Sequence, residues 1–175
     1  MSRILSGIAQ IDAAFCVRIY LLSGKRALDS FFYAISRAGD GYLYGLAGLV
    51  LALSFPERAS QILLAGGTAF AFELSLYKLL KNTIKRVRPC EAIAFITNRI
   101  APPDTFSFPS GHTAAATVMT VILGAFFPVL IAPMVIYSFL VGFSRVYNGV
   151  HYPGDVIAGA ALGFGSAELA LLIFS

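Results

Sequence analysis

Long apolar stretches alternate with short polar breaks along this chain, and the stretches have the length of membrane-spanning helices. No Asp, Glu, Lys or Arg occurs between positions 105 and 144, a block about twice as long as the roughly 20 residues that one span needs. Pro128 and Pro133 divide this block, because an internal proline removes a backbone hydrogen bond and ends or kinks a helix. The predicted spans are residues 41–55, 59–80, 111–127, 129–147 and 153–174.

The start of the chain has the pattern of an amphipathic helix. Apolar residues recur there at steps of three and four, at Ile4, Ile8, Ile11, Phe15, Ile19 and Leu22. Asp12 and Arg18 fall on other faces, so we predict that residues 2–22 lie along the membrane interface. The alternative is a tilted crossing in which the protein shields Asp12. A short helix capped by Asp29 is expected to follow and to end at Ala38.

The composition agrees with a membrane protein, because 58% of the residues are hydrophobic, 13% are charged and the mean hydropathy is +0.79. We predict an all-α fold, a polytopic transmembrane bundle of five to six helices with an N-terminal amphipathic helix. Residues 1–175 would form one membrane-embedded domain, with an N-terminal region at 1–38 and a core at 39–175. The net charge of +4 does not indicate a nucleic-acid partner, since the basic residues gather beside one loop.

Three polar clusters interrupt the apolar pattern. They are KNTIKRVRP at 81–89, PSGH at 109–112 and SRVYNGVHYPGD at 144–155. The first cluster closes a span, the second opens the next span, and the third follows the span that returns. Counting crossings in this way places all three clusters on the same face of the membrane.

The first cluster carries several cations at the end of a span, where Lys and Arg commonly anchor a helix to lipid head groups. A binding role is the second interpretation. Arg88 precedes Pro89, which restricts its backbone and helps to fix the direction of the guanidinium group. Guanidinium groups suit phosphate oxygens because they offer paired N–H donors.

The second cluster places Ser110 and Gly111 at the start of a helix, where unpaired backbone N–H groups and the helix dipole favour an anion. An ordinary serine cap beside an incidental histidine is the alternative. If a phosphate binds there, His112 lies beside it and is placed to protonate a leaving oxygen.

The third cluster combines Arg145, His151 and Asp155. Asp155 follows His151 by four positions and can reach the imidazole across the first turn of a helix that begins near Pro153. A carboxylate on one ring nitrogen leaves the other free to act as a nucleophile. A capping aspartate and a surface histidine are the alternative, although charged groups at the edge of a span are costly unless paired or used.

Taken together, the clusters resemble the three-part signature of the type 2 phosphatidic acid phosphatase family of integral membrane lipid phosphatases. The signature is complete and in order, whereas the first forty residues carry none of it. The matching positions are Lys81, Arg88, Pro89, Pro109, Ser110, Gly111, His112, Ser144, Arg145, His151 and Asp155.

The resemblance implies a division of catalytic roles. His151 would attack phosphorus and form a phosphohistidine, Asp155 would hold the ring, and His112 would protonate the departing group and later activate water. Neither a metal nor another cofactor is implied. The resemblance also implies that the phosphate is bound by Lys81, Arg88, Ser110, Gly111 and Arg145.

On this interpretation the substrate is a lipid phosphate or pyrophosphate, such as undecaprenyl pyrophosphate, phosphatidylglycerol phosphate, phosphatidic acid or lipid A 1-phosphate. The resemblance implies a multi-pass protein of the bacterial inner membrane with its site on the periplasmic face. The positive-inside bias would instead put the basic loop in the cytoplasm, and we favour the periplasm because catalysis explains those cations. The alternatives are a lipid-phosphate binding or flipping protein and, less favoured, a vanadate-dependent haloperoxidase relative.

Three further charged residues lie near the clusters. Glu73 is expected to form a structural pair with Lys78, the alternative being that it faces the site. Asp104 and Arg99 belong to the polar loop and are expected to be solvated surface residues, with substrate selection as the alternative.

Overall fold

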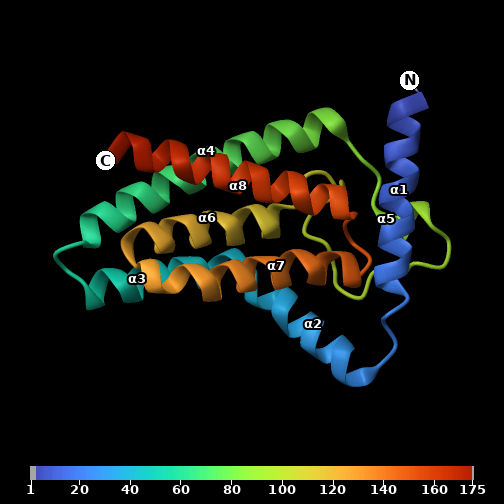
Figure 1. Ribbon diagram of the computed structural model, residues 1–175, viewed down its shortest axis with the longest axis horizontal. Helices are drawn as coiled ribbons and strands as arrows, with labels where there is room; N and C mark the ends of the chain where they lie inside the picture. Colours follow the sequence, from blue (N-terminus) through green and yellow to red (C-terminus); the bar gives the residue numbers. More distant parts are fainter. Residues whose placement is uncertain (1–2, 175) are drawn as a thin grey trace.

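The computed structural model describes residues 3–174, and within that range all regular secondary structure is helical. This confirms the predicted all-α class (Figure 1). The elements are α1 (Arg3–Tyr20), α2 (Arg26–Ala38), α3 (Gly41–Ser54), α4 (Ala59–Ile84), α5 (Pro89–Ala92), α6 (Gly111–Phe126), the 3₁₀ helix η1 (Pro128–Leu130), α7 (Ile131–Tyr147) and α8 (Pro153–Phe174).

The bundle is organised around α6, which packs against α4, α7 and α8, and α3 lies beside α4. Small residues allow this close packing, as they do in other membrane bundles. A Cβ atom at Gly159 would lie 2.4 Å from the Ser110 carbonyl oxygen, and one at Gly163 would lie 2.2 Å from that of Ala114. The backbones of α6 and α8 therefore touch, and the start of α6 is held beside the start of α8.

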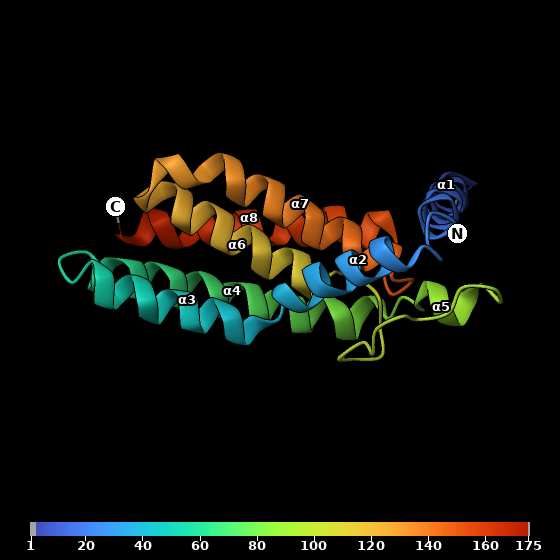
Figure 2. The same cartoon turned by 90° about the horizontal axis from the view of Figure 1, so that it is seen from below.

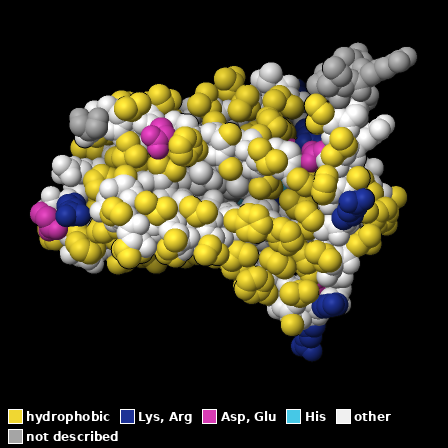
Figure 3. All heavy atoms as spheres, in the orientation of Figure 1, with side chains coloured by type: hydrophobic (Ala, Val, Ile, Leu, Met, Phe, Trp, Pro, Cys, Tyr) yellow, Lys and Arg dark blue, Asp and Glu magenta, His cyan; other side chains and the backbone are white. Residues whose placement is uncertain are grey.

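The outer surface of the bundle is apolar, as Figure 3 shows for one face. Within residues 3–174, three helical stretches are long and apolar enough to cross a membrane, at Ala59–Ala92, Pro128–Tyr147 and Pro153–Phe174. The helices α3 and α6 are apolar but shorter. Together these helices confirm the predicted transmembrane helical bundle.

Helix α1 runs across one end of the bundle, crosswise to the other long helices (Figures 1 and 2). Cys16 and Tyr20 pack against Ile96 and residues near the start of α8, whereas Ile8 and Phe15 remain exposed. This crosswise position favours the interfacial interpretation over a tilted crossing. The predicted start of the helix at residue 2 lies outside the described residues.

The boundaries of several elements differ from the predictions. The predicted cap of α2 is wrong, because the helix begins at Arg26 and Asp29 lies inside its first turn, where it accepts the Gly24 N–H. Helix α4 continues beyond residue 80, so Lys81 occupies its last turn. The predicted break at Pro128 is the 3₁₀ helix η1, whereas Pro133 lies in the first turn of α7.

Candidate active site

The structure brings the three polar clusters together at the end of the bundle that α1 crosses. The Arg88 side chain donates to the Val150 carbonyl at 2.7 Å, and its Nη1 lies 3.4 Å from His151 Nε2. The Ser110 backbone N–H donates to the Asp155 carbonyl at 3.0 Å. The first cluster thus contacts the third, and the second contacts the third, as the count of crossings predicted.

Three buried cations surround this meeting point, and we call Lys81, Arg88 and Arg145 the cation cluster. Arg145 donates from Nη1 to Ser36 Oγ at 2.6 Å, but its Nε and Nη2 are buried without a hydrogen-bond partner. Buried donors in proteins nearly always have acceptors. The free donors of Arg145 are therefore chemically suited to an anion.

Asp104 binds two members of the cation cluster, so its predicted place on the solvated surface is wrong. Its Oδ1 accepts from Lys81 Nζ at 2.7 Å and from Arg88 Nη2 at 2.6 Å, and its Oδ2 accepts from the Tyr77 hydroxyl. Burial alone would raise the pKa of Asp104, but the hydrogen bonds from Lys81 and Tyr77 lower it below its usual value. The Asp104 carboxylate therefore pairs with two of the three members of the cation cluster, Lys81 and Arg88.

His151 is buried and faces Arg88 with one ring nitrogen and Asp155 with the other. The Asp155 Oδ2 atom lies 3.6 Å from His151 Nδ1, within ion-pair range and longer than a hydrogen bond. Burial is the largest cause that lowers the pKa of His151, to about 3; Asp155 raises this pKa, and Arg145 and Arg88 lower it further. A neutral imidazole is the form in which a histidine can attack phosphorus.

Asp155 is itself held by residues that the sequence analysis did not select. It accepts the Tyr152 N–H on Oδ2 at 2.9 Å and the Arg86 Nη1 on Oδ1 at 2.8 Å. The second nitrogen of Arg86 donates to Asp12 of α1 at 2.6 Å. An acidic residue on the polar face of an amphipathic helix was the only sequence signal for this contact.

His112 is placed by a second carboxylate, that of Asp40, which lies between α2 and α3. The distance from His112 Nε2 to Asp40 Oδ1 is 3.0 Å, and Asp40 also pairs with Arg37 at 3.1 Å. No pattern in the sequence singled out Asp40. The contact gives the predicted acid catalyst a carboxylate partner, as the predicted nucleophile His151 has Asp155 nearby.

Ser110 and Gly111 occupy the start of α6 as predicted, but the serine hydroxyl does not cap a backbone N–H. It contacts Thr113 Oγ1 at 2.9 Å instead. A Cβ atom at Gly111 would lie 2.8 Å from the Tyr77 ring, so the glycine leaves room for that ring beside the start of α6.

A groove of about 550 Å³ runs between α3, α4 and α6, and it reaches His112 and Gly111 at one end. Its walls are apolar, and Gly45 and Gly48 of α3 leave open space beside them. Its polar lining includes Glu73, which is buried.

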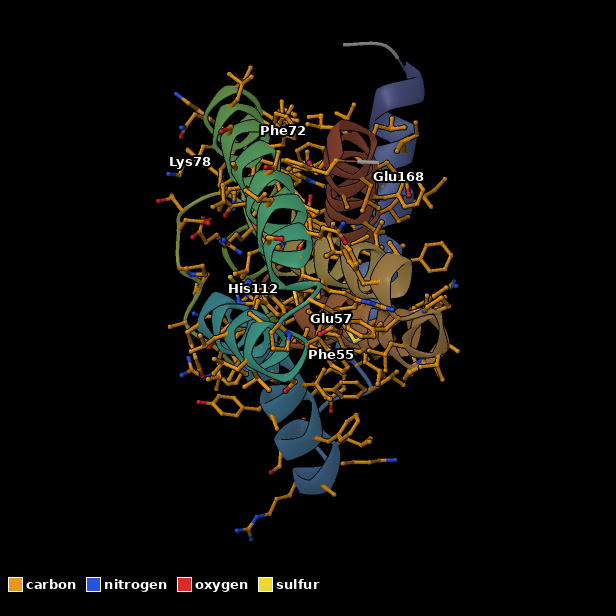
Figure 4. All side chains as sticks on the ribbon, turned by 90° about the vertical axis from the view of Figure 1, so that its left-hand side faces the viewer. Phe55, Glu57, Phe72, Lys78, His112 and Glu168 are labelled. Carbon is orange, nitrogen blue, oxygen red and sulfur yellow. The ribbon has the colours of Figure 1, made fainter. Side chains whose placement is uncertain are left out.

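The predicted pair between Glu73 and Lys78 is wrong. No ion pair joins the two side chains in the described part of the chain, where Lys78 is exposed. Figure 4 shows Lys78 on the outer side of α4, pointing away from the bundle, whereas His112 lies between α3 and α4. Glu73 instead lines the groove that leads to His112, which agrees with the alternative that it faces the site.

Comparison with known proteins assigns the family. The model of the PAP2 superfamily matches residues 62–175, and the chain belongs to this superfamily. This confirms the resemblance to the type 2 phosphatidic acid phosphatases. The match covers all three polar clusters and omits α1, α2 and α3.

Relatives and solved structures agree with that assignment. Decaprenylphosphoryl-5-phosphoribose phosphatase of Mycobacterium tuberculosis is 35% identical over 122 residues, which are 67% of this chain and 64% of that protein, so the match spans less than two thirds of its length. The crystal structure of Aquifex aeolicus LpxE is similar with a TM-score of 0.74 and 29% identity, covering 91% of this chain and 93% of that one. A PAP2 type phosphatidylglycerolphosphate phosphatase from Bacillus subtilis has a TM-score of 0.76 and 26% identity, covering 95% and 86% of the two chains.

Proposed function

We propose that this protein is an integral membrane phosphatase that hydrolyses a lipid phosphate or pyrophosphate through a phosphohistidine at His151. The observation that carries the proposal is the pairing of a buried, neutral imidazole with Arg88 on one nitrogen and Asp155 near the other. The free donors of Arg145 add binding capacity for phosphate oxygens beside it. Such a site supplies a nucleophile and neutralises the charge that develops in phosphoryl transfer.

The reaction has two steps. In the first, Nε2 of His151 attacks phosphorus, a P–N bond forms, and the P–O bond to the leaving group breaks as His112 gives that oxygen a proton. In the second, His112 accepts a proton from water, the water oxygen attacks phosphorus, and the P–N bond breaks to release phosphate. Ser110 and the backbone of Gly111 are proposed to bind phosphate oxygens at the start of α6, together with Lys81, Arg88 and Arg145.

The position of the site supports a lipid as substrate. The cation cluster lies at the end of a bundle with an apolar outer surface, and the groove beside His112 is lined by apolar residues. A phosphate at head-group depth would meet the cations while its tail stays in an apolar environment. The names of the relatives favour the same class of substrate, because two of them specify lipid phosphates.

The proposal extends to location. We place the protein in the bacterial inner membrane with the site on the periplasmic side, as the family resemblance suggests. The residues 1–175 would act as one membrane-embedded unit, because α1 and α2 both contact the bundle around the site.

The test is phosphate release by the purified protein from a panel of four lipids: undecaprenyl pyrophosphate, phosphatidylglycerol phosphate, phosphatidic acid and lipid A 1-phosphate. At least one lipid should be hydrolysed, and His151→Ala should abolish release while Lys78→Gln, which changes an exposed residue of α4, should not. Full activity of His151→Ala, or no release from any lipid by the unaltered protein, would contradict the proposal.

A further inference from the structure

Helix α1 reaches the nucleophile through one carboxylate. Asp12 Oδ2 accepts from Arg86 Nη2 at 2.6 Å, and Arg86 Nη1 donates to Asp155 Oδ1 at 2.8 Å. The side chain of Asp12 is 11% exposed and that of Arg86 25%, so solvent only partly screens the first pair. Arg86 therefore bridges two carboxylates, one on α1 and one on α8.

The guanidinium group of Arg86 has a third contact that fixes its plane. Its Cζ lies 3.9 Å from the centre of the Tyr152 ring, a stacking distance for arginine on an aromatic face. The Tyr152 backbone N–H donates to the other oxygen of Asp155. Arg86 and Tyr152 thus hold Asp155 from both sides.

Asp12 also binds the start of α8 directly. Its Oδ1 accepts the Gly154 N–H at 2.8 Å, so a residue of α1 satisfies a free backbone donor in the first turn of α8. A Cβ atom at residue 154 would lie 2.8 Å from Asp12 Oδ2, so the glycine leaves room for the carboxylate at this position. Asp12 contacts the residue before Asp155 and also the arginine that binds Asp155.

These contacts have one geometric consequence. The position of Asp155 relative to His151 depends on where α8 begins and on where Arg86 lies, and Asp12 contributes to both. The gap of 3.6 Å between Asp155 Oδ2 and His151 Nδ1 leaves little tolerance, because a further displacement would leave the imidazole without its orienting carboxylate.

We propose that Asp12 is a positioning residue for the nucleophile, acting through Arg86 and Gly154 to hold Asp155 against His151. The inference rests on the proposed function of His151. It gives α1, which lies outside the matched family region, a role in the reaction.

The test compares Asp12→Asn with the unaltered protein on the lipid that is hydrolysed fastest. The asparagine keeps an acceptor for the Gly154 N–H and removes the charge that faces Arg86. We expect kcat to fall between about tenfold and about 100-fold, since misplacement of a reacting group by about 1 Å can cost that much. KM should stay within about twofold, because Asp12 does not contact the cation cluster.

Two comparisons separate positioning from stability. Arg86→Met should lower kcat similarly, Arg86→Lys should recover part of it, and the double variant of Asp12→Asn with Arg86→Met should lose little more than Arg86→Met alone. The matched control is Arg18→Gln, which removes a charge from an exposed position of the same helix and should leave kcat unchanged. The amount of folded protein is measured for each variant by size-exclusion chromatography.

The inference is overturned if kcat of Asp12→Asn stays within about twofold of the unaltered protein. It is also overturned if the loss disappears when activity is expressed per folded molecule, or if the losses of the two single variants multiply in the double variant. Absence of phosphate release by the unaltered protein would instead contradict the proposed function, so the two failures are distinguishable.

Discussion

Replacing Asp104 with asparagine should strengthen the binding of phosphate. The Asp104 carboxylate accepts charged hydrogen bonds from Lys81 at 2.7 Å and from Arg88 at 2.6 Å. A phosphate that binds these cations must first displace the carboxylate. Asparagine keeps the shape of the side chain and removes the charge, so the competition weakens.

The structure sets the size of the effect. A hydrogen bond to a charged group contributes about 1.5–3 kcal/mol, and Asp104 makes two of them within the cation cluster. Suppose that the substitution removes only about 1.5 kcal/mol, the lower value for one such hydrogen bond. The affinity for phosphate should then increase about tenfold, because about 1.4 kcal/mol corresponds to a tenfold change in a binding constant.

The assay is inhibition of lipid phosphate release by inorganic phosphate or vanadate. The inhibition constant should fall about tenfold in Asp104→Asn. The matched control is Glu91→Gln, which removes the same charge from an exposed residue of α5 and should leave the constant unchanged. An unchanged or higher constant in Asp104→Asn would refute the reasoning and would mean that Asp104 positions Lys81 and Arg88 for phosphate rather than competing with it.

Two further predictions concern protonation and packing. The pKa of His151 is lowered from 6.5 to about 3, so below pH 6.5 the unfolded chain binds a proton that the folded protein does not take up. The free energy of unfolding should therefore decrease as the pH falls from 6.5 towards 3. Nitrogen NMR of labelled histidine should show a neutral His151 ring from about pH 8 to about pH 5, and a titration midpoint of His151 near pH 6.5 would contradict this account. Gly163→Ala should lower the thermal midpoint, because the new Cβ would lie 2.2 Å from the Ala114 carbonyl oxygen and overpacking costs about 1–3 kcal/mol. Gly165→Ala on the same helix has open space around it and should be neutral or stabilising, and equal effects of the two substitutions would exclude the packing explanation.

The sequence was sufficient for the helical spans and for the residues of the three clusters. The apolar blocks are long, and the spacing from His151 to Asp155 places His151 just before a helix and Asp155 in the first turn of that helix. Counting crossings then brought Arg88, Ser110 and Asp155 to one end of the bundle, where the structure shows their contacts.

The carboxylates around the site could not be predicted in the same way. Asp12, Asp40 and Asp104 contact residues 74, 72 and 23 positions away in the chain, respectively, so no local periodicity reports these pairs. Each one depends on how helices or loops pack in three dimensions. The pairing expected for Glu73 failed for the opposite reason, since proximity to Lys78 in the sequence does not put the two side chains on the same face of α4.

The most direct test of the account is to trap the covalent intermediate. The purified protein is mixed with its lipid substrate, quenched in alkali to preserve phosphohistidine, and digested for mass spectrometry. We predict a phosphate group on the peptide that contains His151, and none on that peptide after His151→Ala. A protein that releases phosphate rapidly while no phosphate ever appears on His151, or one that carries it on His112 instead, would contradict the central claim.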